Sequence, residues 1–158
     1  FPEGDGTAKR RVSLTCGGDL LAVDVLVPAN TEHLFDGIAD FYCTADIVSA
    51  NLESTIASNK PTGRTQPAGS LARMNTSSEM FQRFRDQGKI NFISTATNHA
   101  LDWDVDGVEA TLDVLRSSGA RFAGTASSAS TNGARSGWSS SCRSRATLSW
   151  ARCAMPRR

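Results

Sequence analysis

Short β-prone runs alternate with amphipathic segments along this sequence, and that alternation limits its fold more than any other feature. The strongest β-prone runs are residues 12–16, 47–53 and 90–96. Apolar residues recur with helical spacing between or after these runs, at 34–42, 78–88 and 105–118. Strands that alternate with helices in this way favour βαβ units and a mostly parallel sheet with helices on both faces. We therefore predict an α/β fold.

Local signals set the expected limits of these elements. The first strand is predicted to stop at Gly17-Gly18, immediately before Asp19. The stretch 57–69, rich in Pro, Gly, Ser and Asn, predicts a loop, and a short strand follows it at 70–74. Gly119 is the expected cap of the last helix, ahead of a short strand at 120–124. The helix over 78–88 is expected to turn Met80, Phe81 and Phe84 inward.

Polar side chains follow three of the predicted strands directly. Asp19, Glu53 and the pair Asn98-His99 are each the first polar group after a β-prone run. Because ligands of open parallel sheets gather beyond the carboxyl ends of the strands, we expect these residues at one edge. Carboxylate and amide oxygens beside an imidazole suit a divalent ion such as Mn²⁺, Mg²⁺, Fe²⁺ or Zn²⁺.

Each of these residues also has a purely structural interpretation. Asp19 can satisfy backbone donors in a turn, Glu53 can be a solvated strand end, and Asn98 can begin a loop. A lone His99 can be a hydrogen-bonded structural histidine, and Asp102 can cap the helix that follows. Only the joint position of these residues favours a site.

The size and charge of the chain indicate one domain with an unusual tail. A length of 158 residues fits a single domain with a sizeable core. Residues 131–158 contain six Arg and no Lys or acidic residue, so the whole-chain net charge of +1 leaves −5 for residues 1–130. We expect this Arg/Ser-rich tail to be disordered or the product of a frameshift. A nucleic-acid-binding arm is an alternative, but the arginines show no periodicity, and no nucleic acid is expected as a partner.

Cysteine usage and hydropathy say little about the compartment. Cys16 and Cys43 lie in apolar segments and are expected to be small buried residues, and no Cys-x-x-Cys motif occurs. The sequence contains neither a signal peptide nor an apolar run near the roughly 20 residues of a membrane helix.

Three segments carry a resemblance to a known family. "VSLTCGGDLL", "ADIVSANLEST" and "FISTATNHALDWDVDGVEATLDVLRSSGARFAGT" contain Gly-Asp, Asn-Leu-Glu and Asn-His-Ala-Leu-Asp in order. In this order and spacing they resemble the CapA family, bacterial proteins linked to poly-γ-glutamate capsule synthesis, over about residues 11–130. The resemblance implies a calcineurin-like metallophosphoesterase fold and a place at the cell envelope or outside the cell, with the capsule machinery as a possible partner.

The resemblance also implies roles for individual residues. Asp19, Glu53 and Asn98 would be metal ligands in a site for two divalent ions, with Glu53 as the bridge. His99 would stabilise substrate charge or protonate the leaving oxygen, and Asp102 would orient His99 or its loop. The implied reaction is metal-assisted hydrolysis of a phosphoester or of the γ-linked amide of poly-γ-glutamate.

The sequence departs from the family pattern in two ways. Thr97 stands where the family usually has a first Asn, and the chain has only two histidines, His33 and His99, where family sites add imidazoles from the second half of the domain. We therefore expect an N-terminal half-domain (residues 1–130) of impaired activity, marginal alone, with an apolar sheet face left open. The alternative function is a noncatalytic component of a capsule polymer assembly complex.

Overall fold

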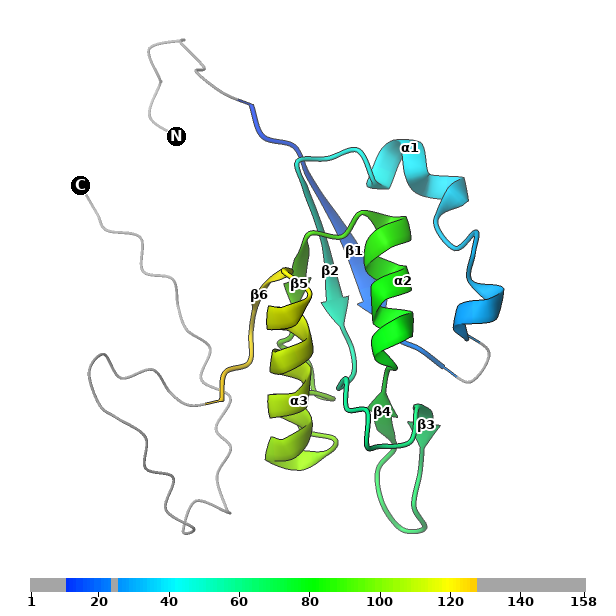
Figure 1. Cartoon of the computed structure of the whole chain (residues 1–158), viewed down its shortest axis with the longest axis vertical. Coiled ribbons are helices and arrows are strands. Elements are labelled where there is room, and N and C mark those ends of the chain that lie inside the picture. The colour runs from blue at the N-terminus through cyan, green and yellow to red at the C-terminus, as the bar shows by residue number, and fades with distance from the viewer. Residues whose placement is uncertain (1–10, 24–25, 128–158) are drawn as a thin grey trace, which may run out of the picture. The chain divides into compact units, whose positions relative to one another are not determined.

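A four-stranded parallel sheet organises the computed structural model, which describes residues 11–23 and 26–127. The sheet has the order β1-β2-β5-β6, as Figure 1 shows, and a separate antiparallel pair is formed by β3 and β4. The strands are β1 (Leu14–Leu20), β2 (Ile47–Leu52), β3 (Gly63–Thr65), β4 (Arg73–Asn75), β5 (Phe92–Ser94) and β6 (Arg121–Ala123). The predicted α/β fold with a parallel sheet flanked by helices is confirmed. The expectations for the Arg/Ser-rich tail lie outside the described residues.

Three α-helices connect the strands, and two of them match the sequence signals closely. They are α1 (Ala39–Tyr42), α2 (Ser78–Gly88) and α3 (Asp104–Ser117). The Ser77 side chain caps α2 by accepting a hydrogen bond from the Met80 amide at 3.1 Å. After α3 the chain turns at Gly119, whose φ of +70° is the left-handed conformation that glycine adopts without strain.

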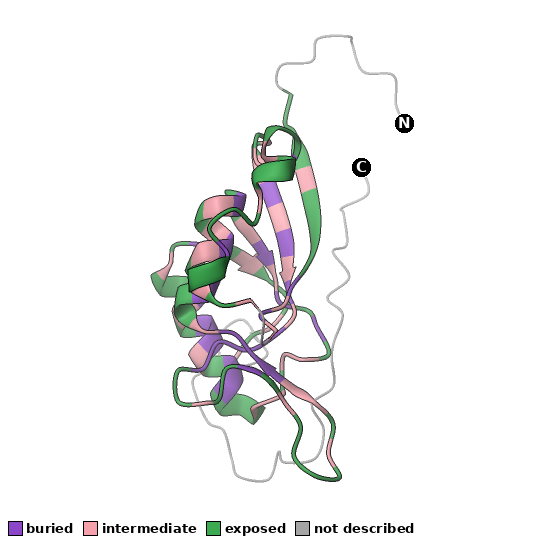
Figure 2. Ribbon diagram, turned by 90° about the vertical axis from the view of Figure 1, so that its right-hand side faces the viewer, coloured by how far each residue is buried: buried purple, intermediate pink, exposed green. Residues whose placement is uncertain are grey.

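All the described helices lie on the same face of the sheet (Figure 2). Each new parallel strand is added on the same side of the one before, from β1 to β6. Connections between parallel strands are almost always right-handed, so this strand order places every connection on one face. The expectation of helices on both faces is therefore wrong for the described part of the chain, because covering the second face requires a reversal of strand order. The open sheet face that was expected of a half-domain agrees with this arrangement.

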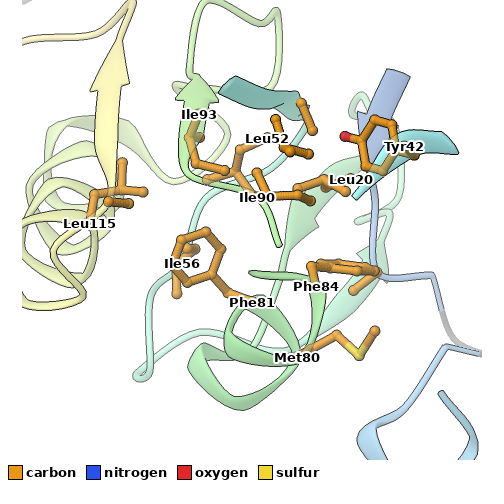
Figure 3. Packing of buried hydrophobic residues seen from close by; sticks show 14 residues of the cluster. Leu20, Tyr42, Leu52, Ile56, Met80, Phe81, Phe84, Ile90, Ile93 and Leu115 are labelled. Atoms are coloured by element: carbon orange, nitrogen blue, oxygen red, sulfur yellow. The ribbon is translucent and has the colours of Figure 1, made fainter. Parts of the chain in front are cut away.

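The hydrophobic core fills the space between the sheet and α2 and α3 (Figure 3). In β2 buried and half-buried residues alternate strictly, with Val48, Ala50 and Leu52 pointing inward. Met80, Phe81 and Phe84 of α2 meet them from the helix layer, as the sequence predicts. Leu115 of α3 and Ile93 of β5 belong to the same core.

The opposite face of the sheet is open in the described residues. Leu14 is 59% exposed, Cys16 is exposed, and Ile47 and Phe92 are half-buried. The expectation that Cys16 is buried is therefore wrong. The physical reason is its position on an edge strand, whose outward side chains meet neither a helix nor a second sheet layer among the described residues.

The first strand also extends farther than the sequence predicts. Gly17 and Gly18 do not end β1 but lie in a bulge between Cys16 and Asp19, after which pairing with β2 resumes. Gly17 is needed there because a Cβ on it would lie 2.5 Å from the Tyr42 hydroxyl oxygen. That hydroxyl donates a 2.8 Å hydrogen bond to the Ser49 carbonyl, and burial raises the pKa of Tyr42.

The connection from β1 to β2 is less helical than its apolar spacing predicts. The connection contains two 3₁₀ turns, η1 (Pro28–Asn30) and η2 (Asp36–Ile38). Of the helix expected over 34–42, residues 36–38 form η2 and only four residues form α1. The connection is still anchored before β2. At its far end the amide and hydroxyl of Ser13 each donate a 2.8 Å hydrogen bond to Asp46, and these bonds lower the pKa of the Asp46 carboxyl.

Candidate functional site

The strands β1, β2 and β5 end together at what we call the carboxyl edge of the sheet. In the sheet register Asp19 pairs with Asn51, and Asn51 pairs with Ser94. Figure 1 shows the arrowheads of β1 and β2 directed at this edge, toward the β3–β4 pair. The Asn51 side-chain amide donates one hydrogen bond to Asp19 Oδ1 at 2.8 Å and a second to Glu53 Oε2 at 2.6 Å. Two of the predicted site residues are thus joined through one nitrogen.

This amide holds two carboxylates close to each other. Their oxygens lie no farther apart than the sum of those two hydrogen-bond lengths. The ion pairs found among the described residues involve neither group, so the negative charge of the pair is not neutralised there. Such a pair of oxygens, one exposed and one half-buried, has the chemistry that attracts a hard divalent cation.

Asn51 was not among the residues that sequence reasoning selected. A signal for it was present in the Asn-Leu-Glu motif, because residues two apart in a strand point to the same face. Asn51 and Glu53 therefore share a face, with the buried Leu52 pointing away between them.

A second polar pair lies in the loop after β5. His99 Nδ1 is 2.7 Å from Asp102 Oδ2, and the two side chains are only 19% and 12% exposed. The same carboxylate oxygen accepts a hydrogen bond from the Met74 amide of β4. Because a carboxylate accepts, His99 Nδ1 carries the proton, and this leaves Nε2 for other chemistry. The contact has the geometry expected of an orienting carboxylate.

No hydrogen bond or ion pair within the described residues joins Asn98 or His99 to the carboxylate pair. Asn98 is exposed. Over the ranges 11–23 and 26–127, no group of three or more His, Cys, Asp or Glu side chains is positioned to hold a metal ion. The predicted site residues thus form two separate pairs, Asp19 with Glu53 and His99 with Asp102, and Asn98 belongs to neither. Their roles as ligands and catalytic groups stay predictions. His33 lies apart, exposed and paired with Asp36.

The β3–β4 pair anchors both parts of the site. The sequence did not predict this pair, because β3 lies within the loop expected over 57–69. The Thr55 amide donates to the Met74 carbonyl, and the Thr76 amide donates to the Thr55 carbonyl. Asn75, only 1% exposed, accepts from the Ala57 amide through Oδ1. The segment after Glu53 and the loop of His99 are therefore both held by β4.

A cavity of about 430 Å³ borders Asp19 on the helix side of β1. Its walls are mainly apolar and include Leu20, Leu34, Phe35 and Phe84. Asp19 is the only carboxylate among the described residues that line it, so the candidate site is the carboxyl edge, where Asp19 and Glu53 lie together, and not this cavity.

The donor set of the carboxyl edge fits one half of a divalent metal site. Asp19 and Glu53 supply hard oxygens at close range, and the Asn51 amide holds them in place. A complete site needs further ligands, which the described residues do not bring to this pair.

Comparison with known proteins identifies the family. None of the described helices has the length and apolar character needed to cross a membrane. No curated protein matches the chain. The family model of the bacterial capsule synthesis protein PGA_cap matches residues 9–151, a range that includes the sheet, the carboxyl edge and part of the Arg/Ser-rich tail. This match confirms the resemblance seen in the sequence motifs: the chain belongs to the family of bacterial capsule synthesis proteins described by PGA_cap.

Proposed function

We propose that the chain acts in capsule synthesis through a metal-dependent hydrolase site at the carboxyl edge. The observation that carries the proposal is the carboxylate pair of Asp19 and Glu53, held together by Asn51 at the ends of adjacent strands. These two carboxylates would hold a divalent ion. When bound, such an ion supplies Lewis-acid activation of water at neutral pH.

His99 and Asp102 complete the proposed reaction. Hydrolysis forms a bond from a water oxygen to the phosphorus or carbonyl carbon and breaks the bond to the leaving oxygen or nitrogen. That leaving atom needs a proton, which the doubly protonated His99 ring can donate from Nε2 while Asp102 holds the opposite ring nitrogen at 2.7 Å. The proton that the attacking water loses then restores the ring. Asp102 is then a positioning residue. The proposed substrate is a phosphoester or a γ-linked glutamate polymer.

Hydrolysis with and without Mn²⁺ tests the proposal on the full chain. A chromogenic phosphodiester and a γ-glutamyl anilide serve as substrates. We expect Mn²⁺-dependent turnover that falls at least about tenfold in His99→Gln and Asp19→Asn. Asp40→Asn, which removes an exposed carboxylate of α1, is the matched control and should keep full activity. Turnover that is the same in all these variants would exclude the site.

The second candidate is a noncatalytic component of a capsule polymer assembly complex. The observation that favours it is the separation of the carboxylate pair from the His99–Asp102 pair, with no group of three His, Cys, Asp or Glu side chains placed to hold a metal in the described residues. In that case the chain should bind polymer or partner proteins while both substrates remain intact, with or without Mn²⁺.

A further inference from the structure

A cluster of two cations on one indole lies next to the His99–Asp102 pair. Lys60 Nζ is 5.4 Å from the centroid of the Trp103 ring, and the Arg73 guanidinium carbon is 5.1 Å from it. The two positive groups therefore lie no farther apart than the sum of these distances. We call Lys60, Arg73 and Trp103 the cation platform.

The cation platform is rigidly attached to the candidate site. Trp103 follows Asp102 directly in the chain, and Arg73 precedes Met74, whose amide donates to the same Asp102 carboxylate that holds His99. The Lys60 carbonyl accepts a 3.2 Å hydrogen bond from the buried Asn75 amide. Figure 1 shows the β3–β4 pair beside the first turn of α3, where these segments meet.

The charges of the platform are not balanced by the described part of the protein. The ion pairs among the described residues involve neither Lys60 nor Arg73. Two like charges drawn to one ring repel each other, and a cation–π contact only partly offsets this repulsion. An anion placed against them would reduce it.

The indole also has unused hydrogen-bonding capacity. Trp103 Nε1 is buried and has no acceptor among the described residues. Buried donors are nearly always paired, so this group marks a place where an acceptor oxygen is favoured. Two cations that take part in no ion pair and one unpaired donor therefore occur on a single ring among the described residues.

We propose that the cation platform binds an anionic oxygen group of the ligand, a carboxylate or a phosphate, beside His99. The proposal rests on the proposed function in assigning this anion to the substrate. It explains how an acidic polymer or a phosphoester would be held while the reacting bond lies at the carboxyl edge.

Binding without metal and without turnover tests the platform separately from the hydrolase proposal. The indole N–H resonance of Trp103, assigned by its loss in Trp103→Phe, is followed by NMR on the full chain at low ionic strength. One titration uses inorganic phosphate and another a tetraglutamate peptide. A saturable shift with either probe supports the site and identifies the anion source, whereas no shift with both overturns it.

Substitutions separate a built site from general electrostatic attraction. Lys60→Gln and Arg73→Gln remove one charge each and should raise the dissociation constant about fivefold. Arg64→Gln is the control, because Arg64 lies in the same β3–β4 pair but donates only to Gln66 in the described structure. It should change the constant less than about twofold. An equal loss in all three variants overturns the proposal, and thermal melting confirms that each variant is folded.

Discussion

Removal of the Asn51 amide is the most informative single perturbation of the carboxyl edge. In Asn51→Ala, both hydrogen bonds to the carboxylates of Asp19 and Glu53 are lost, and the two negative charges lose the donor that they share. A hydrogen bond to a charged group contributes about 1.5–3 kcal/mol when it is well shielded. Asp19 is exposed and Glu53 only half-buried, so solvent screening reduces the expected total loss to about 1–2 kcal/mol.

Urea unfolding at pH 7 without divalent ions measures this loss as a lower midpoint at an unchanged slope. Ser49→Ala is the matched control, because Ser49 precedes Asn51 on the same face of β2 and its hydroxyl makes no hydrogen bond within the described residues. It should cost less than about 0.5 kcal/mol. If Asn51→Ala is as stable as Ser49→Ala, the amide does not hold the carboxylates together in solution, and the geometry of the site is wrong.

Three further predictions concern the fold. Gly17→Ala should lower the free energy of unfolding by about 1–2 kcal/mol in urea, because the new Cβ displaces the Tyr42 hydroxyl. Gly18→Ala is the control and should cause no such loss, because its Cβ would meet no atom within 4 Å. Equal effects of the two substitutions would contradict the close contact at Gly17. Leu115→Ala, at a fully buried position, should cost about 2–5 kcal/mol in the same assay, and a loss below about 1 kcal/mol would mean that α3 does not pack as described. Because the pKa of Asp46 is lowered in the folded state, its contribution is present above the ordinary carboxyl pKa of about 3.9 and is lost as the pH falls through the lower folded value. Urea unfolding at several pH values should therefore show that the stability difference between the wild type and Asp46→Asn shrinks below about pH 4. A difference that grows below this pH would contradict the lowered pKa of Asp46 in the folded state.

The layered fold could be predicted because its signals are local. Alternation in β2, the Ser77 cap and inward face of α2, and the turn at Gly119 all depend on residues within a few positions of one another. The bulge at Gly17 could not be predicted in this way. It depends on Tyr42, 25 positions away, which occupies the space that a side chain at residue 17 would need.

The site was predictable in outline but not in its connections. The ends of parallel strands correctly place Asp19 and Glu53 at one edge, since strand direction alone decides this. The anchoring by β4 depends on long-range contacts of Asn75 and Met74 with segments up to 28 residues distant, for which the sequence has no local pattern. Exposure of the second sheet face was expected from the half-domain prediction and not from local periodicity, because it depends on strand order.

Calorimetric titration of the full chain with Mn²⁺ tests the central claim that Asp19 and Glu53 form a cation-binding pair. The wild type should bind Mn²⁺, and Asp19→Asn and Glu53→Gln should each weaken binding at least about tenfold, because each removes one of two charged oxygen ligands. Asp40→Asn should bind as the wild type does. Unchanged affinity in the Asp19 and Glu53 variants, or no Mn²⁺ binding by the wild type, would contradict the account.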